Sequence, residues 1–153
     1  MADLVLPDIL VLGKALTGGY IGHAVTVANH KVFDAFYSDD DRLALTHASY
    51  FMGNPLACAV ALKGIEIFER EDYMSKIRHI EQVSRGEMEA FTDPRIKEVR
   101  IMGGCVCVEV HDSRDLEGFQ QFAYERGVFS RPFLNYMYSM VPYVISDEEL
   151  IKF

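Results

Sequence analysis

The spacing of apolar residues in this sequence changes sharply near its middle, and this change constrains the fold more than any other feature. After Asp72, apolar side chains recur at helical steps, at Tyr73, Ile77, Ile80, Met88 and Phe91. From Lys97 the period becomes two, through Val99 and Ile101 and, after Gly103-Gly104, through Val106, Val108 and Val110. The pattern predicts a helix that ends before Pro94, followed by two strands joined at a glycine turn.

The first part of the chain predicts strands followed by a short helix. Residues 8–13 form an apolar run that ends at Gly13, which is typical of a strand buried on both faces. Residues 21–28 alternate as a second strand, and residues 30–37 could form a short helix. Because helices and strands occur in both halves, an α/β protein is expected.

Helix-start signals mark the middle and the end of the chain. Asn54-Pro55 predicts a long helix to about Arg70, because Asn can cap free N–H groups and Pro lacks one. Residues 116–123 have helical spacing, and residues 128–133 read as extended. Ser146 and Glu149 form a capping box, but only about two turns remain before the last residue. A capped helix this short indicates a sequence that is cut rather than finished.

Composition excludes several classes of protein. The chain has 153 residues, of which 50% are hydrophobic, so it can bury a core as one domain or slightly more. A net charge of −8 argues against nucleic-acid binding, which relies on clustered Lys and Arg. The three cysteines do not suggest a disulfide framework, and the first residues have no signal-peptide or membrane-span pattern. A cytoplasmic protein is expected.

Two basic residues are the main candidates for chemistry. Lys14 follows the first predicted strand, where partial burial would free its amine for a Schiff base. On spacing alone, a surface lysine is the commoner case. Arg131 lies in the extended, aromatic-lined segment Ser130-Arg131-Pro132-Phe133, and its guanidinium suits a carboxylate. The alternative for Arg131 is a structural salt bridge with an acidic residue.

Other polar residues carry weaker signals. Cys105, Cys107 and His111 lie close in sequence but are more typical of packed cysteines than of a zinc site, so no metal is expected. His47 lies in the loop from Thr46 to Asn54, which leads into a helix N-terminus, where N–H groups and the helix dipole favour an anion such as phosphate.

Three separated motifs resemble those of class III pyridoxal-phosphate aminotransferases. They are Pro7-Asp8-Ile9-Leu10 with Gly13-Lys14-Ala15-Leu16-Thr17-Gly18-Gly19, then Phe51-Met52-Gly53-Asn54-Pro55-Leu56-Ala57-Cys58-Ala59, then Arg131-Pro132-Phe133 with Tyr138 and Pro142-Tyr143. The resemblance covers nearly the whole chain. It implies the C-terminal part of a fold-type-I PLP-dependent transferase, an α/β fold. Residues 1–53 would end the large PLP-binding domain, 54–71 would form a connecting helix, and 72–153 would form a small C-terminal α/β domain, apparently truncated.

The resemblance also implies roles for individual residues. Lys14 would be the catalytic lysine that binds the aldehyde of pyridoxal 5'-phosphate and then moves a proton on the substrate. Ser49 and Tyr50 would bind the cofactor phosphate of a neighbouring subunit, which implies a homodimer. Here Tyr50 replaces the family's Thr or Ser, and Ser49 could substitute for it. The substrate would contact Arg131, which holds its carboxylate, Tyr138, and Ala48, where the family has Gly.

Among class III substrates, Arg131 and Tyr138 favour those of biotin biosynthesis. The reaction would then convert 8-amino-7-oxononanoate to 7,8-diaminononanoate, with S-adenosylmethionine as the amino donor. Another omega-aminotransferase, or a remnant that keeps the fold without catalysis, remains open. The family's Gly-Ser phosphate loop, ring-stacking aromatic residue and pyridine-binding Asp precede the lysine and are absent from this sequence. We therefore expect the chain alone to be inactive.

Overall fold

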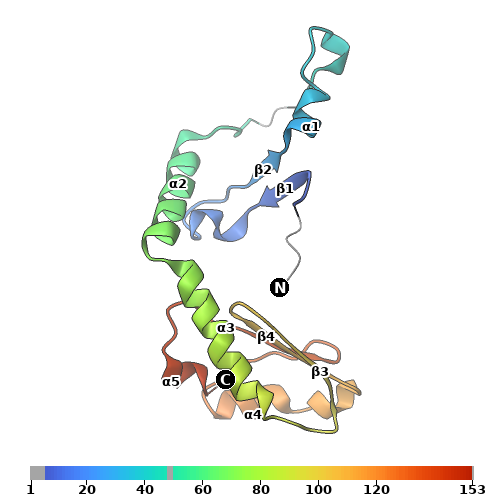
Figure 1. Ribbon diagram of the computed structural model, residues 1–153, viewed down its shortest axis with the longest axis vertical. Helices are drawn as coiled ribbons and strands as arrows, with labels where there is room; N and C mark the ends of the chain where they lie inside the picture. Colours follow the sequence, from blue (N-terminus) through green and yellow to red (C-terminus); the bar gives the residue numbers. More distant parts are fainter. Residues whose placement is uncertain (1–5, 48–49, 153) are drawn as a thin grey trace. The chain divides into compact units, whose positions relative to one another are not determined.

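The structure is a computed structural model that describes residues 6–47 and 50–152 (Figure 1). The chain divides into two compact units, residues 1–71 and residues 72–153. Each unit has its own small antiparallel sheet. Among the described residues, no helix is both long and apolar enough to cross a membrane.

The first unit contains a two-stranded sheet and two helices. Strands β1 (Ile9–Leu12) and β2 (Val25–Ala28) pair antiparallel. Helix α1 (His30–Asp34) follows β2 directly, and the 16-residue helix α2 (Pro55–Arg70) ends the unit. The first strand and the long helix are confirmed, whereas the second strand begins at Val25, four residues after its predicted start at residue 21. Helix α1 stops three residues before the predicted end, so the prediction for residues 30–37 was too long.

The predicted burial of the first strand is wrong. All four residues of β1 are exposed, and Val11 retains 67% of its accessible surface. The physical reason is that β2 is the one strand paired with β1 in the described part of the chain, so both apolar faces of the pair meet solvent. The apolar run therefore has the composition of a central strand without the neighbours that such a strand needs.

The second unit combines a three-stranded antiparallel sheet with helices. The elements of this unit are α3 (Tyr73–Glu89), β3 (Ile96–Met102), β4 (Cys105–Val110), α4 (Phe119–Glu125), β5 (Tyr136–Met140) and α5 (Asp147–Leu150). The strand order is β3-β4-β5, and β3 and β4 form the predicted hairpin around Gly103-Gly104. The predicted long helix, the hairpin and the capping box of Ser146 and Glu149 are confirmed.

One predicted boundary in this unit is wrong. Leu116 belongs to a separate 3₁₀ turn, and α4 begins at Phe119, because Gly118 between them adopts φ +77°. Such a left-handed residue interrupts the helix. Residues 128–132, all of them described, adopt no regular strand, although Phe133 forms a bridge to Tyr136.

A small apolar core and a polar clamp hold the second unit together. Ile80, Val141 and Leu150 are buried against one another. At the hairpin turn, the Glu81 carboxylate accepts a hydrogen bond from the Gly103 N–H at 2.8 Å, and Arg85 donates to the Ile101 carbonyl at 2.6 Å. Helix α3 thereby fixes the position of the β3–β4 turn.

Candidate active site

Lys14 lies where β1 ends and the chain turns. Its backbone adopts φ +48°, a left-handed conformation that costs an ordinary residue about 1–2 kcal/mol. Lys14 begins a 3₁₀ turn that ends at Thr17 and is followed by Gly18, also left-handed. Lys14 is thus the first residue of a tight turn, and its own backbone carries the strain.

The surroundings of Lys14 differ from the expectation of partial burial. Lys14 is exposed, because the faces of β1 beside it are uncovered. Within the described residues its amine has no hydrogen-bond or ion-pair partner. The remaining lysines each contact an acidic or aromatic side chain; they are Lys31, Lys63, Lys76, Lys97 and Lys152. Lys14 is therefore the one lysine whose amine has no hydrogen-bond, ion-pair or ring contact among the described residues.

Helix α2 holds the turn that carries Lys14. A Cβ added at Gly64 would lie 3.1 Å from the Leu16 carbonyl oxygen, so only a glycine lets the helix approach this closely without a shift. Thr17 is buried, and its hydroxyl donates to the Ile21 carbonyl at 2.5 Å. Sequence reasoning missed Gly64, although an isolated glycine inside a helix pattern signals close packing.

The predicted phosphate-binding residues are placed only in part. Ala48 and Ser49 lie outside the described residues, whereas Tyr50 is fully exposed. The N-terminus of α2 does not offer the free donors expected for an anion. Pro55 has no N–H, and the Asn54 side chain accepts from the Leu56 and Ala57 N–H groups at 3.0 and 3.2 Å. The Leu56 and Ala57 N–H groups are thus occupied by the cap, and binding of an anion by the loop before Asn54 stays a prediction.

The two substrate candidates lie in the second unit. Arg131 is exposed and has no ion-pair partner in the described part of the chain, which disfavours the structural salt bridge considered as its alternative. Tyr138 lies on β5 opposite Cys107, with 44% of its surface accessible. Lys14 and Tyr50 thus belong to one unit, and Arg131 and Tyr138 belong to the other.

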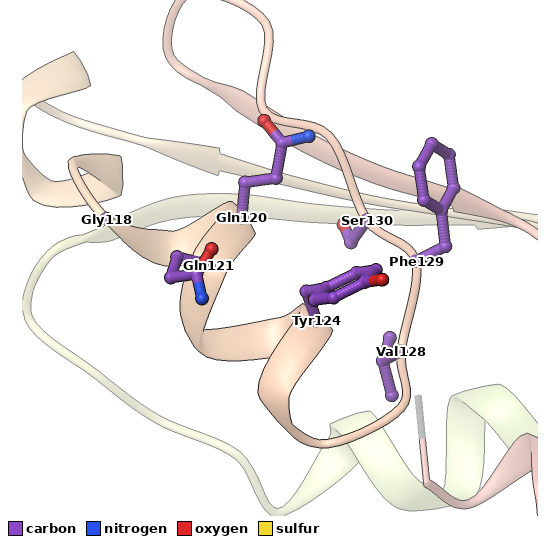
Figure 2. Close-up of a pocket in the computed structure, with 7 residues that line it drawn as sticks. All are labelled: Gly118, Gln120, Gln121, Tyr124, Val128, Phe129 and Ser130. Atoms are coloured by element: carbon purple, nitrogen blue, oxygen red, sulfur yellow. The ribbon is translucent and has the colours of Figure 1, made fainter.

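A cavity lies just before Arg131 along the chain. Its volume is about 440 Å³. Figure 2 shows the residues that line it, which come from α4, from Gly118 before it and from residues 128–130. Ser130 is buried, and its hydroxyl has no hydrogen-bond partner among the described groups. The candidate site residues are not in the described lining of the cavity. We assign it no part in the chemistry.

Sequence reasoning also missed a buried carboxylate next to the hairpin. Glu109, only 5% exposed, accepts hydrogen bonds from Lys97 at 2.6 Å and from Asn135 at 3.2 Å, with Arg100 at 3.4 Å. The bond from Lys97 is the main reason that the pKa of Glu109 lies below its usual value. In the sequence, Glu109 could have been noticed as one acidic residue between two apolar residues, Val108 and Val110. Because the carboxylate is paired, it supports the sheet rather than offering a free acid or base.

The amine of Lys14, which has no partner among the described residues, fits one requirement of a pyridoxal-phosphate site. An aldehyde cofactor requires an amine that no carboxylate holds, and Lys14 supplies one. The capped N–H groups of Leu56 and Ala57 are not free to bind its phosphate. Nor does the described part of the chain hold three or more His, Cys, Asp or Glu side chains placed for a metal ion.

The family model and the curated relatives that match this chain point to the same protein family. Residues 2–153 match the family model described as aminotransferase class-III. The chain is 37% identical over 149 residues to an adenosylmethionine-8-amino-7-oxononanoate aminotransferase of Buchnera aphidicola, covering 97% of this chain and 35% of that protein. The chain therefore spans about a third of the length of the curated relatives that it matches.

Solved structures support the same conclusion. The adenosylmethionine-8-amino-7-oxononanoate aminotransferase of Methanocaldococcus jannaschii superposes with a TM-score of 0.77 at 28% identity, covering 95% of this chain and 36% of that one. An omega transaminase of Pseudomonas jessenii in complex with PMP gives a TM-score of 0.82 at 26% identity, with coverages of 96% and 35%. The expected α/β fold of a PLP-dependent aminotransferase is confirmed. This chain belongs to the class III aminotransferase family.

Proposed function

We propose that this chain carries the lysine and the carboxylate-binding arginine of a PLP-dependent aminotransferase that acts on 8-amino-7-oxononanoate, with S-adenosylmethionine as amino donor. The observation that carries the proposal is the amine of Lys14, which lacks a partner among the described residues, unlike the other five lysines. The names of several relatives favour these two substrates.

Each residue has a defined task in this proposal. Pyridoxal phosphate supplies an aldehyde that condenses with amines and a ring that stabilises negative charge on the substrate carbon. Lys14 holds the cofactor through its amine and, once released, accepts and returns the proton at the reacting carbon. Arg131 orients the oxo acid by a charge-assisted, bidentate hydrogen bond to its carboxylate. Tyr138 and Ala48 are assigned to the substrate pocket, and Ser49 and Tyr50 to the phosphate.

We further propose the organisation expected from the sequence. Residues 1–53 end the large domain, 54–71 connect it to the small domain, and 72–153 form that domain. The fully exposed Tyr50 suits a contact outside its own unit, which supports phosphate binding across a homodimer. A cytoplasmic location completes the proposal.

Labelling with the cofactor tests the role of Lys14. The 153-residue chain is mixed with pyridoxal phosphate, reduced with borohydride, digested and examined by mass spectrometry. We expect a pyridoxyl group on Lys14 at several times the occupancy of the other five lysines. Lys14→Ala should abolish this signal, and Lys63→Ala, which removes an exposed ion-paired lysine, should leave it unchanged.

The same experiment distinguishes a catalytic lysine from a remnant. Labelling spread evenly over the six lysines would reject the proposed cofactor site and favour a non-catalytic module. The main support for such a module is Tyr50, which stands where the family has Thr or Ser. Turnover with both substrates is not expected from this chain alone, since the ring-binding Asp of the family is absent from its sequence. Lys14 labelling without turnover is therefore the outcome that the proposal requires.

A further inference from the structure

The three-stranded sheet of the second unit brings four sulfur atoms to one face. Met102, Cys105 and Met140 are register partners on β3, β4 and β5, so they form one row across the sheet. Cys107 lies two residues beyond Cys105 on β4. Because side chains alternate between faces with period two, Cys107 shares the face of that row.

This sulfur face is the outer face of the sheet. Residues of the opposite face are buried, with Ile101 at 8% and Val108 at 5% exposure. Met102 and Met140, in contrast, keep 78% and 75% of their surface accessible. Their thioethers are flexible and exposed, while the backbone register fixes where each side chain begins.

The spacing suits a bound ion rather than a disulfide. Cross-strand partners have Cβ atoms about 4.5–5.5 Å apart. Cys105 and Cys107, two residues apart on one strand, are about 6.6 Å apart at Cα, too far between Cβ atoms for the ~3.8 Å of a disulfide. Two metal–sulfur bonds of about 2.3 Å each span about 4.6 Å, so one ion would join the two thiols once their side chains lean toward each other.

We propose that Cys105, Cys107, Met102 and Met140 form a binding site for a soft monovalent metal ion of the Cu(I) class. Thiolate and thioether ligands select such ions over hard cations. Each cysteine that binds loses its proton to solvent as the metal–sulfur bond forms, and no oxidant is needed. The site lies beside Tyr138, the register partner of Cys107 that the proposed function assigns to the substrate pocket, but none of its four ligands has a role in that function.

Competition for Cu(I) tests the site directly. The reduced chain is titrated anaerobically against the coloured Cu(I) complex of bicinchoninate. We expect one tightly held equivalent per chain. The double variant Cys105→Ser/Cys107→Ser should lose it, and Met102→Leu/Met140→Leu, which keeps the volume of two exposed side chains, should weaken binding at least about tenfold, roughly 1.4 kcal/mol.

Two control variants separate this site from adventitious binding. Cys58→Ser removes the cysteine of the other unit, and Met137→Leu changes a methionine of β5 on the opposite face, opposite Val108. Both should bind as the parent chain does. Equal loss in Cys58→Ser, binding that survives in the double serine variant, or no effect of the two leucines would each overturn the proposal. The leucine pair provides a decisive test even if the serine variant does not fold.

Discussion

Left-handed backbone conformations occur at or near the two candidate groups. Among the described residues, three that are not glycine adopt positive φ: Lys14, Asp72 and Leu134. Lys14 is the candidate catalytic residue, and Leu134 lies three positions after Arg131. Strained residues persist where the surrounding structure determines them, and they are frequent at functional sites. The strain at Lys14 therefore supports the role proposed for it.

Leu134 allows this strain to be measured away from the lysine. Phe133 and Tyr136 exchange backbone hydrogen bonds at 2.8 and 2.9 Å, so Leu134 and Asn135 form a two-residue turn. Glycine is favoured at a first turn position with φ +54°. We expect Leu134→Gly to raise the free energy of unfolding by about 1 kcal/mol, measured by urea denaturation, because relief of strain exceeds the entropy cost of glycine.

A second exposed residue of the same unit serves as the control. Val144 is 74% exposed, against 68% for Leu134, but its φ is not positive. Val144→Gly should lower stability, because glycine there adds only entropy to the unfolded chain. If both variants lose stability, the turn at Leu134 stores no relievable strain.

At the scale of elements, local signals predicted the helices and strands well. The Asn54 cap, the Asp72 start of α3 and the capping box of Ser146 were all read correctly because each depends on a few neighbouring residues. The exposure of β1 could not be predicted, since burial depends on strands and layers far along the chain. For the same reason, the sequence offered no sign that Lys14 and Arg131 lack acidic partners.

Close packing of α2 on the Lys14 turn yields a prediction at Gly64. Replacement of a helix glycine by alanine usually stabilises by about 0.5–1 kcal/mol, and Gly86→Ala in α3 should show this gain, because no atom lies within 4 Å of the added Cβ. At Gly64 the added Cβ meets a backbone carbonyl at 3.1 Å. We expect Gly64→Ala to lose about 1 kcal/mol, with reduced amide-exchange protection in α2. Equal gains at both sites would show that the turn adapts freely.

An ion pair before β3 predicts acid sensitivity. Asp93 accepts hydrogen bonds from the Arg95 side chain at 2.9 and 2.7 Å and from its backbone N–H at 2.9 Å. The Arg95 side chain is the main reason that the pKa of Asp93 falls from 3.8 to about 2. Because the folded-state pKa is the lower one, this stabilisation is complete above pH 3.8 and is lost as the pH falls toward about 2.

Unfolding measured against pH checks this assignment. Asp93→Asn should be less stable than the parent chain at neutral pH, and the difference should shrink below pH 3.8 as the parent loses its carboxylate. Glu87→Gln changes an exposed acid on α3 and should keep the pH profile of the parent chain. A constant difference between Asp93→Asn and the parent across the acid range would mean that the charge of Asp93 contributes nothing.

For the whole molecule, the main feature is apolar surface without a covering layer. The chain spans about a third of the length of its relatives, and its β1 strand exposes apolar side chains on both faces. β1 also has an edge without a paired strand among the described residues. An exposed apolar edge is a template for pairing with another chain. The free chain should therefore associate with itself as its concentration rises.

One substitution on β1 tests this expectation. Val11 is 67% exposed and lies on the edge strand, where a lysine would oppose strand pairing by its charge. Sedimentation velocity over a range of concentrations should show association of the parent chain and a strong reduction in Val11→Lys. Gln82→Lys adds the same charge on an exposed position of α3 and should associate as the parent does. If both lysine variants reduce association equally, net charge rather than the β1 edge controls it, because both variants add one positive charge and only Val11→Lys alters the edge.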